Sequence, residues 1–193
     1  MKSILFIIRY FKYIFIAKSK YSAQSPFLYE FITKVLNNDY NDTNCKRIEK
    51  LRKKLCKSNQ NIKITDFGAG SHINNSKNRK VKDVAKNSAK NSKFGKLLYR
   101  IIKYYKPKNI IELGTSLGIS TLYLATAKED TKIYTFEGCL ETAKIAKNNF
   151  SKMEAKNINL ILGEFQNTLQ KKIEEICSID LAFIDGNHQE KPT

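Results

Sequence analysis

Short apolar runs alternate with helical patterns along the second half of the chain. The apolar runs occupy 109–113, 132–136, 158–162 and 179–184, and the helical patterns between them occupy 120–127, 141–156 and 166–176. Strands that are joined through helices run parallel, and the helices cover the faces of the resulting sheet. We therefore expect an α/β fold with a Rossmann-like parallel sheet of four strands.

The segment before this sheet predicts a helical annex over residues 1–60. Helical patterns cover 3–17 and 43–57, and a third helix is expected to start at Ser25-Pro26 and to end near Asn37-Asn38. Serine is a favoured N-cap, and proline is tolerated at the first helical position. We divide the chain into this annex, a connecting region at 61–106 and the partial Rossmann-like domain at 107–193.

The apolar stretch at 4–17 is neither a typical signal peptide nor a membrane span. Arg9 and Lys12 interrupt it, and no small-residue cleavage site follows Ala17. A span needs roughly 20 apolar residues, so we expect no integral membrane segment. The favoured interpretation is a helix that packs on the domain or forms a homodimer, and a membrane-surface helix is the alternative.

Within the connecting region, Asp66–Ser71 reads DFGAGS and looks like a nucleotide loop. The strand expected before it, 62–65, is short and polar, and residues 71–80 look like an exposed loop. Helices are expected at 81–91 and 92–105, so no second strand ends in an acid about 20 residues later. We therefore assign Asp66–Ser71 a structural or lid role.

A stronger loop candidate joins the apolar run 109–113 to the following helix. The segment Glu112–Ser120 reads ELGTSLGIS, in which Gly114 permits a tight turn and Gly118 permits a close approach of a ligand. The free N–H groups of the next helix lie beside it. Glu137 ends the next strand in YTFEG, at the spacing where an acid accepts hydrogen bonds from ribose hydroxyls. Together they predict a nucleoside site.

Two more strand ends contribute candidates. Gly163-Glu164-Phe165 follows the third strand, where the carboxylate could meet an adenine edge and Phe165 either covers the base or belongs to the core. Asp185 and His188 follow the fourth strand in FIDGNH, at the edge where open parallel sheets bind ligands. They suit a metal ligand and a base, or a role in substrate positioning.

The formal net charge of +17 has two interpretations. Lysines are spread along the whole chain, which is typical of compositional drift, whereas weak non-specific binding of polyanions is the alternative. The four cysteines form no CxxC pair, and with two histidines no zinc-site spacing is present. Reduced thiols are typical of a cytoplasmic protein.

The combination of IIELGTSLGIST, YTFEG and LAFIDGNH resembles the class I S-adenosylmethionine-dependent methyltransferases. The similarity is greatest to small O-methyltransferase-like proteins of the catechol type, in a form seen in bacteroidete genomes. That form also has segments similar to Ser25–Leu36 and Asp66–Ser71, so the resemblance covers nearly the whole chain.

The resemblance implies a set of site residues and one cofactor, and it adds a divalent metal only in the metal-dependent members of the family. It places S-adenosylmethionine against residues of the glycine loop and of the next two strand ends, namely Glu112, Gly114, Thr115, Ser116, Leu117, Gly118, Ser120, Glu137, Gly138, Gly163 and Glu164. It matches Asp185 to the acid that helps to hold a divalent metal in metal-dependent members. His188, which follows it closely, is the second catalytic candidate on its side-chain chemistry. The family's sheet continues after FIDGNH, so we expect this chain to supply only the first four strands.

The function implied is methyl transfer to an O or N nucleophile of a small-molecule acceptor. A nicotinamide-dependent oxidoreductase also fits a glycine loop followed by an acid, but the loop GTSLGIS departs from G-x-G-x-x-G. A vestigial, non-catalytic protein that binds nucleotide, RNA or a membrane surface is a third hypothesis, which the basic charge favours.

Overall fold

The structure is a computed structural model that describes residues 9–13, 25–38, 42–65, 78–88 and 91–186. It divides into two compact units, Met1–Asp39 and Tyr40–Thr193. The division predicted from the sequence, at residues 60 and 106, stays a prediction. Among the described residues, no helix has the length and apolar character that crossing a membrane requires.

The first unit is helical where it is described. Residues 9–13 form a helical turn, and α2 (Pro26–Glu30) continues into the π-helix η2 (Phe31–Leu36). Ser25 has an extended backbone and precedes Pro26 at the first helical position. Asn37 ends η2, so the expected start and end of this helix are confirmed.

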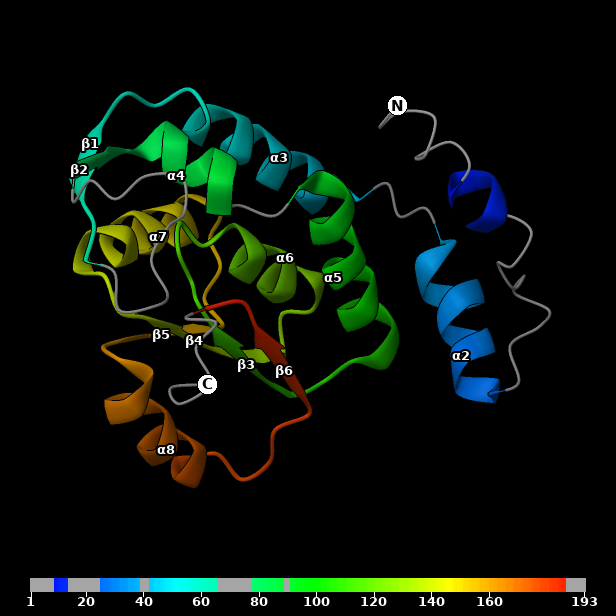
Figure 1. Ribbon diagram of the computed structural model, residues 1–193. Helices are drawn as coiled ribbons and strands as arrows, with labels where there is room; N and C mark the ends of the chain where they lie inside the picture. Colours follow the sequence, from blue (N-terminus) through cyan, green and yellow to red (C-terminus); the bar gives the residue numbers. More distant parts are fainter. Residues whose placement is uncertain (1–8, 14–24, 39–41, 66–77, 89–90, 187–193) are drawn as a thin grey trace. The chain divides into compact units, whose positions relative to one another are not determined.

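The second unit contains a four-stranded parallel sheet in the order β5-β4-β3-β6 (Figure 1). Its strands are β3 (Asn109–Leu113), β4 (Lys132–Glu137), β5 (Ile158–Leu162) and β6 (Leu181–Ile184). They alternate with α6 (Ile119–Ala127), α7 (Leu140–Lys152) and α8 (Phe165–Glu175). The predicted α/β fold is therefore confirmed, because each apolar run forms a strand that is parallel to its neighbours.

The two faces of the sheet are covered differently, because successive side chains of a strand point to opposite faces. Ile110 and Ile133 belong to a large core with residues of α6, α7 and α5 (Ser92–Tyr105). Ile111 and Phe136 belong to a smaller core, against which Phe165, Leu169 and Ile176 pack at α8. Figure 1 shows α8 on the side of the sheet opposite α6.

Helix α3 (Thr43–Leu55) packs into the large core of the second unit. Ile48, Leu51 and Leu55 are buried, as their narrow apolar stripe predicts. The Tyr123 hydroxyl of α6 donates a hydrogen bond of 2.6 Å to Glu49 of α3. The Tyr99 hydroxyl of α5 donates one of 2.5 Å to Asp42, the N-cap of α3.

The expectation of an exposed loop over 71–80 is wrong at its last three residues. Strand β2 (Asn78–Lys80) pairs antiparallel with β1 (Asn61–Lys63) and leads into α4 (Val81–Ser88). Because β2 has the sequence NRK and no apolar alternation, pairing with β1 and not local pattern creates this strand. Residues 66–71, the predicted lid loop, lie outside the described residues.

We expect Gly95→Ala to lower the free energy of unfolding by about 1–2 kcal/mol, because overpacking outweighs the gain in helix propensity. A Cβ atom at Gly95 of α5 would lie 2.2 Å from Cε2 of Tyr123. The Tyr123 ring is fully buried and tied to Glu49, so it has no space to retreat. Urea denaturation measures the effect, with exposed Lys93→Ala on the same helix as the control. Equal stability of Gly95→Ala and the wild type would contradict this packing.

Candidate functional site

The carboxyl ends of the four strands meet along one edge of the sheet. Leu113 of β3 is in register with Phe136 of β4 and with Ile184 of β6. Glu137 of β4 is in register with Leu162 of β5. The residues that follow each strand, which include most of the predicted site residues, are therefore brought to the same edge.

This edge contains a topological switch point between β3 and β6. From β3 the chain builds the sheet outward through β4 and β5, and it then returns through α8 to place β6 on the other side of β3. Crevices at such points are where open α/β sheets bind their ligands. The Asp185 amide donates a hydrogen bond of 2.9 Å to the Leu113 carbonyl, which fixes the chain after β6 beside the chain after β3.

The carboxylate of Glu137 connects the glycine loop to the end of β4. Its Oε2 accepts a hydrogen bond of 2.6 Å from the Ser116 amide, and its Oε1 accepts one of 2.9 Å from the Cys139 amide. Ser116 has a φ of 50°, a left-handed conformation that is uncommon outside glycine. The loop and the acid that the sequence pairs in one nucleoside site are thus in direct contact.

Glu112 lies fully buried at the base of the loop, in a set of hydroxyl groups. Its Oε2 accepts hydrogen bonds of 2.5 Å from the Thr121 hydroxyl and 2.7 Å from the Thr135 hydroxyl. The Thr135 oxygen in turn lies 2.6 Å from the Thr115 hydroxyl. Oε1 is also buried, and it has no hydrogen-bond partner among the described residues.

Burial raises the pKa of Glu112 to about 7. The hydroxyls of Ser120, Thr121 and Thr135 lower the pKa, and the nearby charge of Asp185 raises it further. A carboxyl group with this pKa changes protonation near neutral pH, and its uncompensated oxygen can accept a proton or a cationic donor.

Three glycines at this edge have positive φ angles and no room for a side chain. A Cβ atom at Gly114, where φ is 101°, would lie 2.8 Å from the Asp185 carbonyl oxygen. At Gly118, where φ is 80°, it would lie 2.4 Å from Cε1 of Phe150 in α7. At Gly163, where φ is 138°, it would lie 2.8 Å from Thr168. Close packing within the protein therefore requires glycine at these positions, whether or not a ligand approaches them.

Asn149 is a supporting residue that sequence reasoning missed. It is buried in α7, and its Nδ2 donates a hydrogen bond of 2.9 Å to the carbonyl oxygen of Leu117 in the glycine loop. The signal in the sequence is a polar residue within the apolar stripe of the helix, three positions after Ala146 and next to Phe150. Such a residue needs a hydrogen-bond partner when it is buried.

Phe165 is half-buried and contacts the smaller core. Its ring packs edge-on against Phe136, with ring centroids 6.5 Å apart. It begins α8, and Glu164 precedes it as the N-cap residue, half-buried beside Gly163. Phe165 thus packs against the core with one part of its ring, and its predicted contact with a base stays a prediction.

The last strand end is described as far as Gly186. Asp185 is half-buried at the switch point, and His188 lies outside the described residues. No group of three or more His, Cys, Asp or Glu residues that could hold a metal ion occurs in the described part of the chain. All four cysteines are described and are free thiols.

Comparisons with known proteins identify a family. The model of the O-methyltransferase family matches residues 71–193. A relative from Mycobacterium sp. (strain JLS) with an O-methyltransferase name is 33% identical over 101 residues, which are 51% of this chain and 45% of that protein. A second, from strain KMS, is 32% identical over the same lengths. The chain spans about half the length of these curated relatives.

Solved structures share the fold. The O-methyltransferase from Bacillus cereus in complex with SAH is 19% identical with a TM-score of 0.52, and the match covers 81% of this chain and 59% of that one. The O-methyltransferase TomG from Streptomyces achromogenes, in complex with SAM, is 24% identical with a TM-score of 0.50, over 52% and 47% of the two chains. These similarities confirm the expected class I methyltransferase fold, and none supports a non-catalytic RNA- or membrane-binding protein.

We expect Glu112→Gln to change how the stability of the protein depends on pH. Because the pKa of Glu112 is about 7 in the folded state and lies near 4.5 when unfolded, the folded state binds more protons between these values. Wild-type stability therefore falls as pH rises from 5 to 8, and the substitution removes about 3 kcal/mol of that fall. Urea denaturation at pH 5 and pH 8 measures the free energy of unfolding of both proteins. If this free energy changed with pH by the same amount in both, the raised pKa of the buried Glu112 would be contradicted.

Proposed function

This chain belongs to the O-methyltransferase family, and on that basis we propose that it binds S-adenosylmethionine and takes part in methyl transfer. The observation that carries the proposal is the contact between the Ser116 amide and the Glu137 carboxylate. This contact supports the proposal, because it joins a glycine loop to a carboxylate at the switch point of a parallel sheet, where such folds bind nucleosides. The methyl acceptor that we propose is an oxygen or nitrogen nucleophile of a small molecule.

The residues present at the edge fit such a cofactor. Glu137 is half-buried and suits the two ribose hydroxyls, and the glycine loop with Gly114, Thr115, Ser116, Gly118 and Ser120 suits the methionine part. The buried Oε1 of Glu112 is an acceptor without a partner among the described residues, which suits an ammonium group. The adenine is assigned to the ends of β4 and β5. Gly138 follows β4 there, and Gly163 and Glu164 follow β5.

The fourth strand end suits the chemical step. S-adenosylmethionine, when bound, supplies a methyl group with an electrophilic carbon. The chain has to hold the acceptor in line with that carbon and to remove its proton, and positioning contributes most of the rate. We assign these roles to Asp185 and His188. Asp185 has one carboxylate to offer a divalent metal, if the whole protein uses one.

The remaining proposals concern partners and location. Free thiols at all four cysteines suit a reducing compartment such as the cytoplasm. Exposed aromatic side chains of the first unit, including Tyr10, Phe11 and Phe27, suit a homodimer contact through the N-terminal helices. The division of the chain at residues 60 and 106 remains part of this proposal.

We expect the folded chain to bind S-adenosylmethionine saturably in a calorimetric titration and not to bind NADH. We expect Gly114→Arg to abolish this binding, because Gly114 has a φ of 101° and lies against the Asp185 backbone. Far-UV circular dichroism of the variant checks that it is folded. If the folded wild-type chain binds no S-adenosylmethionine, the proposed function fails for this chain.

We expect Glu137→Gln to remove the preference of the protein for a ligand with a ribose 2′-hydroxyl over one without it. The wild type should bind S-adenosylhomocysteine about tenfold more tightly than its 2′-deoxy form, because a charged acceptor of a hydroxyl proton is worth more than 1 kcal/mol. The variant should bind both compounds with about equal affinity. Glu129→Gln, at an exposed turn before β4, is the control. Unchanged discrimination in Glu137→Gln would remove Glu137 from the ribose site.

A further inference from the structure

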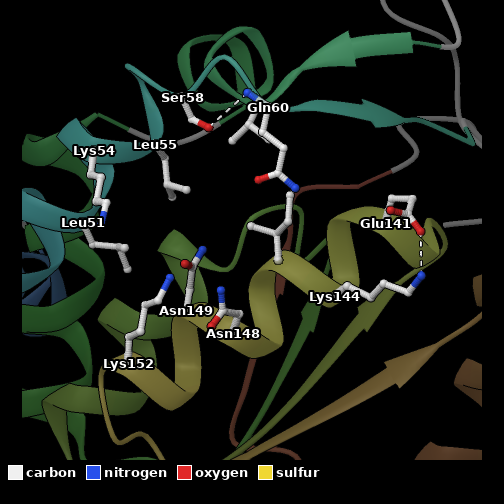
Figure 2. Close-up of a pocket in the computed structure, with 12 residues that line it drawn as sticks. Leu51, Lys54, Leu55, Ser58, Gln60, Glu141, Lys144, Asn148, Asn149 and Lys152 are labelled. Atoms are coloured by element: carbon white, nitrogen blue, oxygen red, sulfur yellow. Dashed lines mark hydrogen bonds and ion pairs between the residues drawn. The ribbon is translucent and has the colours of Figure 1, made fainter.

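A cavity in the unit Tyr40–Thr193 lies between α3 and α7, on the side of α7 that carries Lys144 and Lys152 (Figure 2). Its volume is about 340 Å³, which is within the range of small-molecule sites. Its lining residues come from α3, from the segments around β1 and α4, and from α7. None of them belongs to the glycine loop or to the strand ends of the proposed cofactor site.

The charges around this cavity are unbalanced. Three lysines line it, Lys54, Lys144 and Lys152, and Glu141 is the one acidic residue among the lining residues. Lys144 is neutralised, because its Nζ lies 2.7 Å from Oε1 of Glu141. Lys54 and Lys152 have no ion pair among the described residues. Two ammonium groups on different helices therefore face one cavity without a carboxylate between them.

The rest of the lining combines amide groups with an apolar floor. Gln60 and Asn148 present exposed amides, and Figure 2 shows both directed into the space between the helices. Leu51 and Leu55 of α3 contribute apolar side chains that are otherwise buried in the core. This composition suits a small organic anion whose charged end contacts the lysines while its carbon skeleton contacts the leucines.

We propose that this cavity binds a small phosphate-bearing molecule, with Lys54 and Lys152 as its two charged contacts. Lysine binds phosphate as a point charge, and two ammonium groups from different elements neutralise a phosphate dianion. The lysines approach the cavity from α3 and from α7, so they converge on one site, whereas a nucleic-acid backbone would favour charges in a row along the surface.

The site has a structural connection to the glycine loop. Asn149 lines the cavity, and the same side chain donates the hydrogen bond to the Leu117 carbonyl. An occupant of the cavity therefore contacts the residue that supports the loop. The proposal itself does not depend on the proposed methyltransferase function, because it concerns other residues and a different ligand.

The test compares two double variants of the whole chain that have the same net charge. K54Q/K152Q removes both unpaired lysines of the cavity. K53Q/K147Q removes two exposed lysines of the same two helices that do not line it. Isothermal titration calorimetry at low ionic strength, with inorganic pyrophosphate as the probe, measures binding to each protein and to the wild type. Thermal melting checks that all three are folded.

We expect saturable binding by the wild type, a loss of about tenfold or more in K54Q/K152Q, and a change of about twofold or less in K53Q/K147Q. Equal losses in the two variants would overturn the proposal, because the general positive charge would then attract the probe. Absence of saturable binding by the wild type would overturn it as well. Tighter binding of a short RNA than of pyrophosphate, weakened equally in both double variants, would also overturn the proposal.

Discussion

Strand β3 is one of the two inner strands of the sheet, and the candidate site is built around its carboxyl end. It hydrogen-bonds to β4 on one side and to β6 on the other, and its side chains enter both cores. A buried strand has no freedom to shift register, because a slip of one residue would exchange Ile110 and Ile111 between the two faces. The loop that begins at Gly114 therefore starts from a fixed point beside the ends of β4 and β6. Packing of Gly118 on Phe150 and the bond from Asn149 then hold its far end.

The buried carboxyl of Glu112 is the main electrostatic cost at this point. A carboxylate that is removed from water is destabilised unless hydrogen bonds or a positive charge compensate it. Two threonine hydroxyls satisfy one oxygen, and the other oxygen has no partner in the described part of the chain. A cationic ligand at the edge would lower the pKa of Glu112 and remove the cost, so binding of such a ligand and deprotonation of Glu112 are linked.

The two proposed sites share α7 but use it differently. At its beginning, the Cys139 amide donates a hydrogen bond to the Glu137 carboxylate, so the start of the helix contacts the proposed nucleoside site. Further along, Lys152 and Asn148 face the cavity beside α3. Lys54 and Lys152 therefore line one cavity, and neither has an ion pair among the described residues. The sequence alone did not separate these two lysines from the others, because lysines are spread along the whole chain.

The sequence by itself determined the parallel sheet, the glycine loop and the acid at Glu137. Apolar runs and helical periods reflect burial, and the parallel direction of the strands follows because successive strands are joined through helices. Tertiary structure alone decided the position of β6 beside β3, the β1–β2 pairing, the role of Asn149 and the packing of Phe165 against the smaller core. These features depend on contacts between residues far apart in the chain, such as the bond from Asn149 to Leu117, and local pattern contains no record of them.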